Sequence, residues 1–226
     1  MCSSDLFKKL PYDPVADFAP VGRVAVSSYA LAINPERLPA RDFAEFLSLV
    51  KAKPGQLNYG TPGNGTSPHI ATEVFNREAK TKLNHVPYKG AGPALNDLLG
   101  GQIQLAFDPG VGLNAARSGK LRMVAIAGPA RNPEFPDVPT LEEKGIKGVD
   151  GGPHFGFFAP AAAPREAIEK LNREVIRAMK EPVVLERFKA LAVNIAEPMT
   201  PDQFAAYVRA QSARYGKLLP ELNIGQ

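Results

Sequence analysis

Two kinds of hydrophobic pattern alternate along the chain, and this alternation is typical of an α/β protein. Short apolar runs predict buried strands, and apolar residues spaced by three or four positions predict helices with one buried face. The predicted strands are residues 23–33, 57–59, 83–86, 103–107, 121–127 and 155–160. Residues 129–139 hold four prolines and are predicted to be irregular.

Signals for helix starts accompany the helical patterns. Asp42 is followed three residues later by Glu45, which is the pattern of a capping box. Thr200 is a predicted N-cap, with Pro201 at the first helical position. The predicted helices are residues 43–53, 67–79, 93–99, 111–118, 166–180, 183–191 and 203–218, with a short one after Thr140.

Composition narrows the choice of protein class. The chain has 226 residues and is 44% hydrophobic, which is enough to form a core in one large domain or two small lobes. The net charge is +4, but no basic run with interleaved aromatic residues occurs, so nucleic acid is not an expected partner. No stretch of about 18 apolar residues occurs, so no membrane span is predicted. Cys2 is the only cysteine, so no internal disulfide is possible.

The segment 59–67, Tyr-Gly-Thr-Pro-Gly-Asn-Gly-Thr-Ser, connects a predicted strand to a predicted helix. Its glycines allow a tight turn and a close approach of a ligand to the backbone. Thr66 and Ser67 bring hydroxyl groups to a helix start, which carries unpaired N–H groups and about half a positive charge. These features predict an anion site. The alternative is a tight turn in which Thr66 or Ser67 only caps the helix.

Polar residues also follow the next two predicted strands. Tyr88, Lys89 and Gly90 come after the strand 83–86, and Asp108 ends the strand 103–107. In open α/β sheets, ligands bind at the carboxyl ends of the strands. We therefore expect these residues to face one cleft together with the glycine loop, although each alone is also compatible with an ordinary surface loop.

The three histidines, His69, His85 and His154, lack the spacing of a metal site, so no metal is expected. His69 follows the glycine loop, where it either faces a ligand or fills a groove in the protein. His85 is interpreted as a strand-end residue. Ser67, His69 and Asp108 contain the groups of a catalytic triad, but no G-x-S-x-G motif accompanies them, and an enzyme is not expected.

A series of motifs in fixed order resembles the Bug family, the extracytoplasmic solute receptors of tripartite tricarboxylate transporters. The resemblance covers nearly the whole chain from about residue 6, and it is the ordered set that is specific rather than any one motif. The motifs are LPYDP at 10–14, DFAPV at 17–21, KPGQLNYG at 53–60, GNGTSPH at 63–69, VPYKG at 86–90, DLLGGQ at 97–102, FD at 107–108, PDVPT at 136–140 and FGFFAP at 155–160.

The resemblance implies a two-lobed fold of the type II periplasmic binding protein kind, with mixed sheets, flanking helices and crossover strands between the lobes. The first lobe is expected at residues 1–29 and 154–226, and the second at 30–153. The implied function is capture of a small carboxylate, an organic or amino acid, in the periplasm by a monomeric receptor that delivers it to membrane transporter subunits, and the resemblance implies no cofactor. The alternative is a cytoplasmic ligand-sensing effector domain of a regulator, because such domains share similar folds.

The family's binding residues can be placed on this chain through the matching motifs. The carboxylate-binding loop and helix start fall on 63–67, the Tyr-Lys-Gly turn on 88–90 and the strand-end aspartate on 108. The expected ligand-binding residues are Gly63, Asn64, Gly65, Thr66, Ser67, His69, Tyr88, Lys89, Gly90 and Asp108.

The beginning of the chain departs from the family pattern. Family members start with a signal peptide, then a strand and a Pro/Gly-rich loop, and residues 1–5 do not resemble these. We therefore expect an incomplete first lobe and a missing signal peptide. In that case the apolar side chains of Leu171, Val175 and Phe204 are expected to lose part of their cover.

Overall fold

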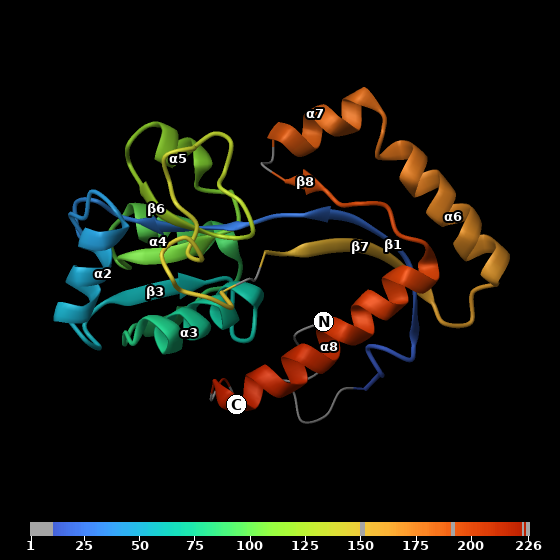
Figure 1. The fold of residues 1–226 in the computed structure, drawn as a ribbon, viewed down its shortest axis with the longest axis horizontal. Coiled ribbons are helices and arrows are strands. Elements are labelled where there is room, and N and C mark those ends of the chain that lie inside the picture. The colour runs from blue at the N-terminus through green and yellow to red at the C-terminus, as the bar shows by residue number, and fades with distance from the viewer. Residues whose placement is uncertain (1–10, 150–151, 191–192, 223, 225–226) are drawn as a thin grey trace. The chain divides into compact units, whose positions relative to one another are not determined.

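The computed structural model describes residues 11–149, 152–190, 193–222 and 224. The chain divides into two compact units, which are coloured by residue number in Figure 1. Unit 1 comprises Met1–Ser27 and Pro153–Gln226, and unit 2 comprises Ser28–Gly152. These boundaries lie one or two residues from those expected for the two lobes. The expected departure at residues 1–5 lies outside the described residues.

Unit 2 is built around a five-stranded sheet with the order β4-β3-β5-β2-β6. In its centre, β3 (Asn58–Thr61) is parallel to β4 (Asn84–Pro87) and β5 (Leu105–Asp108). Beyond β5, β2 (Tyr29–Ile33) is antiparallel to both β5 and β6 (Arg122–Ala127). The carboxyl ends of β3, β4 and β5 therefore lie at one edge of the sheet, as the sequence predicted.

The helices of unit 2 begin and end close to the predicted residues. They are α2 (Phe43–Ala52), α3 (Ser67–Ala79), α4 (Ala91–Leu99) and α5 (Leu113–Arg117). The predicted N-cap of α2 is confirmed, because the Asp42 carboxylate accepts the N–H of Glu45 at 2.9 Å. The second half of the capping box is shifted by one residue, since the Glu45 carboxylate accepts the N–H of Arg41.

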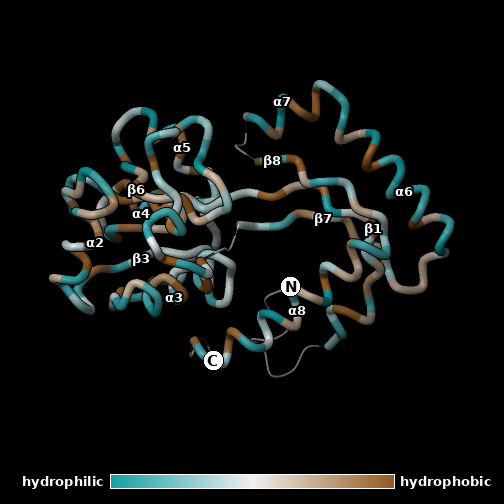
Figure 2. The backbone as a smooth tube through the Cα atoms, viewed as in Figure 1, coloured by the Kyte–Doolittle hydropathy of each residue, from teal (hydrophilic) through white to brown (hydrophobic). Residues whose placement is uncertain are grey.

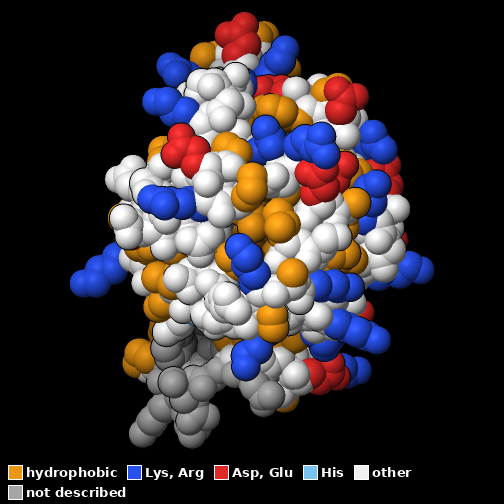
Figure 3. Space-filling model, turned by 90° about the vertical axis from the view of Figure 1, so that its left-hand side faces the viewer, with side chains coloured by type: hydrophobic (Ala, Val, Ile, Leu, Met, Phe, Trp, Pro, Cys, Tyr) orange, Lys and Arg blue, Asp and Glu red, His pale blue; other side chains and the backbone are white. Residues whose placement is uncertain are grey.

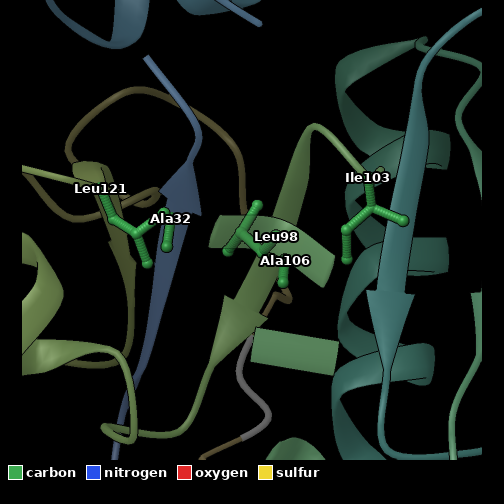
Figure 4. Close-up of a cluster of buried hydrophobic side chains, with 5 residues drawn as sticks. All are labelled: Ala32, Leu98, Ile103, Ala106 and Leu121. Carbon is green, nitrogen blue, oxygen red and sulfur yellow. The ribbon is translucent and has the colours of Figure 1, made fainter. Parts of the chain in front are cut away.

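Neighbouring residues of β5 point to opposite faces of the sheet. Phe107 packs edge-on against Phe75 of α3, with ring centroids 6.1 Å apart. Ala106 belongs to a different buried cluster, drawn in Figure 4, which consists of Ala32, Leu98, Ile103, Ala106 and Leu121. Since Leu98 lies on α4, the helices α3 and α4 cover opposite faces of the sheet (Figure 1).

Unit 1 contains a three-stranded antiparallel sheet with the order β7-β1-β8. Its elements are β1 (Phe18–Val26), β7 (His154–Pro160), α6 (Arg165–Ala178), α7 (Pro182–Ala190), β8 (Asn194–Ile195) and α8 (Pro201–Glu221). Asn172 of α6 is buried, and its amide donates to the carbonyl groups of Val21 at 2.7 Å and Met199 at 2.9 Å. This side chain therefore ties the helix to β1 and to the segment before α8.

Apolar side chains of unit 1 differ in how well they are covered. Leu171 is 50% exposed, as expected, and Figure 2 shows brown and teal positions alternating along α6. Val175 is partly buried. The expectation for Phe204 is wrong, because this ring is only 2% exposed. It packs so closely on Gly156 of β7 that a Cβ atom there would lie 2.5 Å from the ring.

Two predicted elements differ from the structure. The predicted strand 23–33 is two strands, because the chain leaves the sheet of unit 1 at Ser27 and enters the sheet of unit 2 at Tyr29. The predicted helix after Thr140 is a series of turns. Thr140 and Glu143 exchange hydrogen bonds as at a helix start, but Thr140 also forms a bridge with Ile126 of β6, which holds the segment against the sheet.

Charged side chains of both signs share the face of the molecule that Figure 3 shows. On the face drawn in Figure 3, lysine and arginine side chains are scattered, and acidic side chains lie among them. In the part of the chain that the structure describes, no helix has both the length and the apolar character needed to cross a membrane.

Candidate functional site

The glycine loop follows β3 and has a conformation that requires its glycines. Gly63 and Gly65 have φ angles of 150° and 68°, a region that side chains with a Cβ rarely adopt. The Thr61 hydroxyl lies 3.1 Å from the Gly63 carbonyl and 3.3 Å from its N–H. Asn64 is exposed at the tip of the loop, whereas Gly65 is buried. The loop is therefore held in place by Thr61, and its tip at Asn64 is exposed to solvent.

The start of α3 carries no side-chain cap, although Thr66 occupies the N-cap position. The Thr66 hydroxyl instead donates to the Gly63 carbonyl at 2.8 Å. The N–H groups of Ser67 and His69 lie in the first turn, where no carbonyl of the same helix can reach them, and Pro68 has no N–H. The alternative in which Thr66 caps the helix does not describe this site.

The turn before α4 is joined to the glycine loop before α3. Gly90 is its N-cap, with a φ angle of 116°, and no side chain caps this helix either. The N–H of Gly90 donates to the Pro62 carbonyl at 3.0 Å, and the N–H of Tyr88 donates to the Thr61 carbonyl at 2.9 Å. Backbone hydrogen bonds thus join the Tyr88–Gly90 turn to the glycine loop, and two uncapped helix starts meet at one sheet edge.

His69 lies beneath the loop rather than on its surface. The side chain is 8% exposed, and its Nδ1 accepts the N–H of Gly65 at 3.0 Å. Its ring stacks on that of His85, with centroids 3.8 Å apart. Burial lowers the pKa of His69 to about 4, with a further contribution from His85. Burial also lowers the pKa of His85 to about 4. Both rings are therefore neutral at pH 7.

The side chains of the Tyr88–Gly90 turn have different surroundings. The Tyr88 hydroxyl donates to the Asp97 carboxylate at 2.7 Å, and burial together with Asp97 raises the pKa of Tyr88 to about 12. Lys89 is exposed. The ring of Tyr88 lies against Gly60 of β3, where a Cβ atom would be 3.2 Å from Tyr88 Cε2. Tyr88 therefore fixes the turn, and the exposed Lys89 adds a positive charge beside it.

Asp108 ends β5 at the same edge, with 4% of its surface exposed. Its carboxylate accepts the N–H of Gly110 at 2.8 Å and the N–H of Gly112 at 3.0 and 3.1 Å. Burial raises its pKa in spite of these hydrogen bonds. Asp108 also lines a hollow of about 20 Å³, together with Gly60 and apolar side chains of α4. The carboxylate thus orders the loop that follows β5.

The structure brings the predicted residues together at one edge of the sheet of unit 2, where β4, β3 and β5 end. Their contact with a ligand stays a prediction, and the Tyr88 hydroxyl and the Asp108 carboxylate already have protein partners. Sequence reasoning assigned Gly60 to the loop, whereas it lies inside β3, where a glycine often marks a close approach of another group. Sequence reasoning missed Ala91 and Gly92, whose N–H groups begin α4. Within the described ranges, no group of three or more His, Cys, Asp or Glu side chains is placed to hold a metal ion.

Comparison with known proteins identifies the family. The sequence pattern of the family described as "Tripartite tricarboxylate transporter family receptor" matches residues 2–224, and the chain belongs to this family. It is 33% identical to protein BugT of Bordetella pertussis over 220 residues, which cover 96% of the chain and 66% of BugT. It covers 65% of a similar protein encoded between tcbD and tcbE in Pseudomonas sp. strain P51. The chain thus spans just under two thirds of these relatives.

Solved structures of related proteins show the same fold. The periplasmic binding protein BugD matches 99% of the chain and 75% of its own, with a TM-score of 0.88 and 27% identity. Rpa4515 of R. palustris, solved with adipate, matches with a TM-score of 0.89 and 27% identity, over 97% of this chain and 73% of its own. MatC of Rhodopseudomonas palustris, solved with malate, matches with a TM-score of 0.84 and 32% identity, over 96% of this chain and 75% of its own. The chain therefore has the α/β fold of periplasmic binding proteins.

Proposed function

We propose that unit 2 binds a carboxylate group where α3 and α4 begin, and that the protein is the solute receptor of a tripartite tricarboxylate-type transporter. The observation that carries this proposal is the pair of uncapped helix starts joined by the Gly90–Pro62 hydrogen bond. Their first N–H groups belong to Ser67, His69, Ala91 and Gly92. Unpaired N–H groups and the helix dipoles both favour an anion at this position.

The surroundings of these donors also favour a negative group. Lys89 adds an exposed positive charge next to the start of α4. The nearby Asp108 carboxylate opposes an anion less than a free carboxylate does, because it accepts N–H groups of its own loop. Thr66 is oriented away from a ligand by its hydrogen bond to Gly63, whereas the Ser67 hydroxyl stands at the first helical position. Ser67 is thus the hydroxyl that we assign to the ligand.

The ligand class and partners follow from the relatives. Rpa4515 and MatC were solved with adipate and malate, both of which are small dicarboxylates. We assign a small carboxylate of this kind to the present protein, in the periplasm, with membrane subunits of the transporter as partners and a monomer as the binding form. The family match and the periplasmic neighbours support this receptor over a cytoplasmic regulator, which finds no support among them.

A thermal-shift panel tests the preference for a carboxylate. We expect small dicarboxylic acids such as malate or adipate to raise the melting temperature, and their neutral diamides to leave it unchanged. A ligand at 100 times its dissociation constant stabilises the native state by about 2.7 kcal/mol. The diamides are the matched control, because they keep the length and shape of the acid and replace each charged carboxylate by a neutral amide. An equal response to acids and diamides would contradict the proposal.

A further inference from the structure

Aromatic side chains pack beneath the glycine loop. They are not themselves among the N–H donors that we assign to the ligand. Gly65 lies in the buried part of the loop, and its N–H donates to Nδ1 of His69, one turn into α3. Since Nδ1 accepts, the neutral ring carries its proton on Nε2. The Gly65 N–H is directed into the protein by this bond, which leaves the following N–H groups at the helix start for a ligand.

The second histidine holds the other half of the loop. The His85 ring stacks on His69 with an interplanar angle of 18°, and its Nε2 lies 2.6 Å from the Thr61 hydroxyl. That hydroxyl in turn forms a hydrogen bond with the Gly63 carbonyl. Both ends of the Gly63–Gly65 turn are thus connected to one pair of stacked imidazoles, one ring from α3 and the other from β4.

The pair rests on a buried tyrosine. The Tyr59 ring stacks on His85, with centroids 4.9 Å apart, and its hydroxyl donates to the Glu73 carboxylate. Burial and Glu73 both raise the pKa of Tyr59, so it stays a neutral donor. The rings are therefore layered in the order Tyr59, His85 and His69, and this stack cannot shift without moving β3, β4 or α3.

We propose that His69 is the positioning residue of the carboxylate site: its neutral ring, backed by His85, sets the turn that points the helix-start N–H groups at the ligand. This inference rests on the proposed function of the site but concerns a side chain that need not touch the ligand. Protonation of Nδ1 removes the only lone pair that can accept the Gly65 N–H. It also places a positive charge against the face of a second imidazole.

The site is consequently sensitive to acid. The titratable groups packed against His69 are His85 of β4 and Tyr59 of β3, and Tyr59 holds Glu73 of α3 in a hydrogen bond. Both histidines have a pKa of about 4 in the folded protein, below the ordinary value of 6.5. The unfolded chain therefore binds more protons as the pH falls from 6.5 to 4, and the folded loop loses stability across that window.

Two substitutions of His69 separate its roles. His69→Asn keeps an acceptor at the position of Nδ1, since its Oδ1 is also bonded to Cγ, but cannot be protonated there in this range. His69→Leu keeps apolar bulk and removes the acceptor. At pH 7.5 we expect the affinity for malate or adipate to fall about tenfold or more in His69→Leu and to stay within about threefold in His69→Asn.

The loop can also be followed without any ligand. In amide NMR spectra of the protein titrated from pH 7.5 to about 3.5, which passes the pKa of His69, we expect the Gly65 signal to move together with the ring signals of His69. His69→Asn should abolish that movement, whereas His154→Asn, which removes the histidine of unit 1, should leave it unchanged. A Gly65 amide that ignores the His69 titration overturns the proposal, even if His69→Leu fails to fold.

The two proposals fail in different ways. If malate and adipate bind equally well to the protein and to His69→Leu, the positioning role is wrong and the carboxylate site stands. If the Gly65 amide follows His69 but no carboxylate binds, the loop is positioned by His69 and the proposed function is wrong.

Discussion

Replacing Ser67 by proline should weaken carboxylate binding by about tenfold or more while leaving the fold intact. The substitution deletes the N–H at the first position of α3, and a hydrogen bond to a charged group is worth about 1.5–3 kcal/mol. Proline is well accepted at this helical position. The preceding Thr66 has φ −69° and ψ 158°, an extended conformation that a following proline favours. Calorimetry with malate or adipate measures the loss, and thermal denaturation checks the fold.

Ser67→Ala is the matched control for this experiment. It removes the hydroxyl and keeps the N–H, so we expect a smaller loss of affinity than in Ser67→Pro. An equal loss in both variants would assign the contribution to the hydroxyl. Unchanged affinity in Ser67→Pro would show that the start of α3 does not donate to the ligand.

Gly60→Ala should destabilise unit 2 by about 1–3 kcal/mol, the usual cost of overfilling a packed core. A Cβ atom at this position would lie 2.3 Å from Cδ1 of Ile103 and 3.2 Å from the Tyr88 ring. Ile103 is 1% exposed, so its side chain can turn away only within the packed core. A shift of Tyr88 would also displace the turn before α4. Denaturant unfolding of the variant measures the change in the free energy of unfolding.

Gly92→Ala provides the comparison within the same unit. A Cβ atom at Gly92 would have no other atom within 4 Å, and alanine is favoured over glycine in a helix by up to about 1 kcal/mol. We expect this variant to be as stable as the original protein or slightly more so. If Gly60→Ala were as stable as the original protein, the packing around Gly60 would be looser than these distances indicate.

Local signals predicted the helices of this protein well. The limits of α3, Ser67–Ala79, agree with the prediction, because the glycine loop before it and the end of the apolar pattern are both visible in the sequence. The N-caps Asp42 and Thr200 are also confirmed. Each of these features depends on residues a few positions apart, which sequence reasoning can evaluate directly.

Features that depend on pairing between distant segments were harder to predict. The chain passes between two sheets at Ser27 and Ser28, inside a stretch that keeps the pattern of one strand. The strand β8, Asn194–Ile195, is too short to give any periodicity. The burial of Phe204 also depends on a distant residue, because Gly156 leaves room for its ring.

The candidate site was predictable in its location but not in its internal contacts. The loop, the turn and Asp108 follow consecutive parallel strands, so their common edge follows from the order of elements. The stacking of His69 on His85 depends on how α3 packs across β3 and β4, and no spacing in the sequence indicates it. The same holds for the hydrogen bonds that engage Tyr88 and Asp108 within the protein.

The most direct test of the carboxylate site is an amide NMR titration of the protein with malate or adipate. We predict that the N–H signals of Ser67, His69, Ala91 and Gly92 shift together and saturate, because these groups begin α3 and α4. The neutral diamide should leave them in place. If the acid binds but these four signals stay unmoved, or if the diamide shifts them equally, the carboxylate site is not at the start of the two helices.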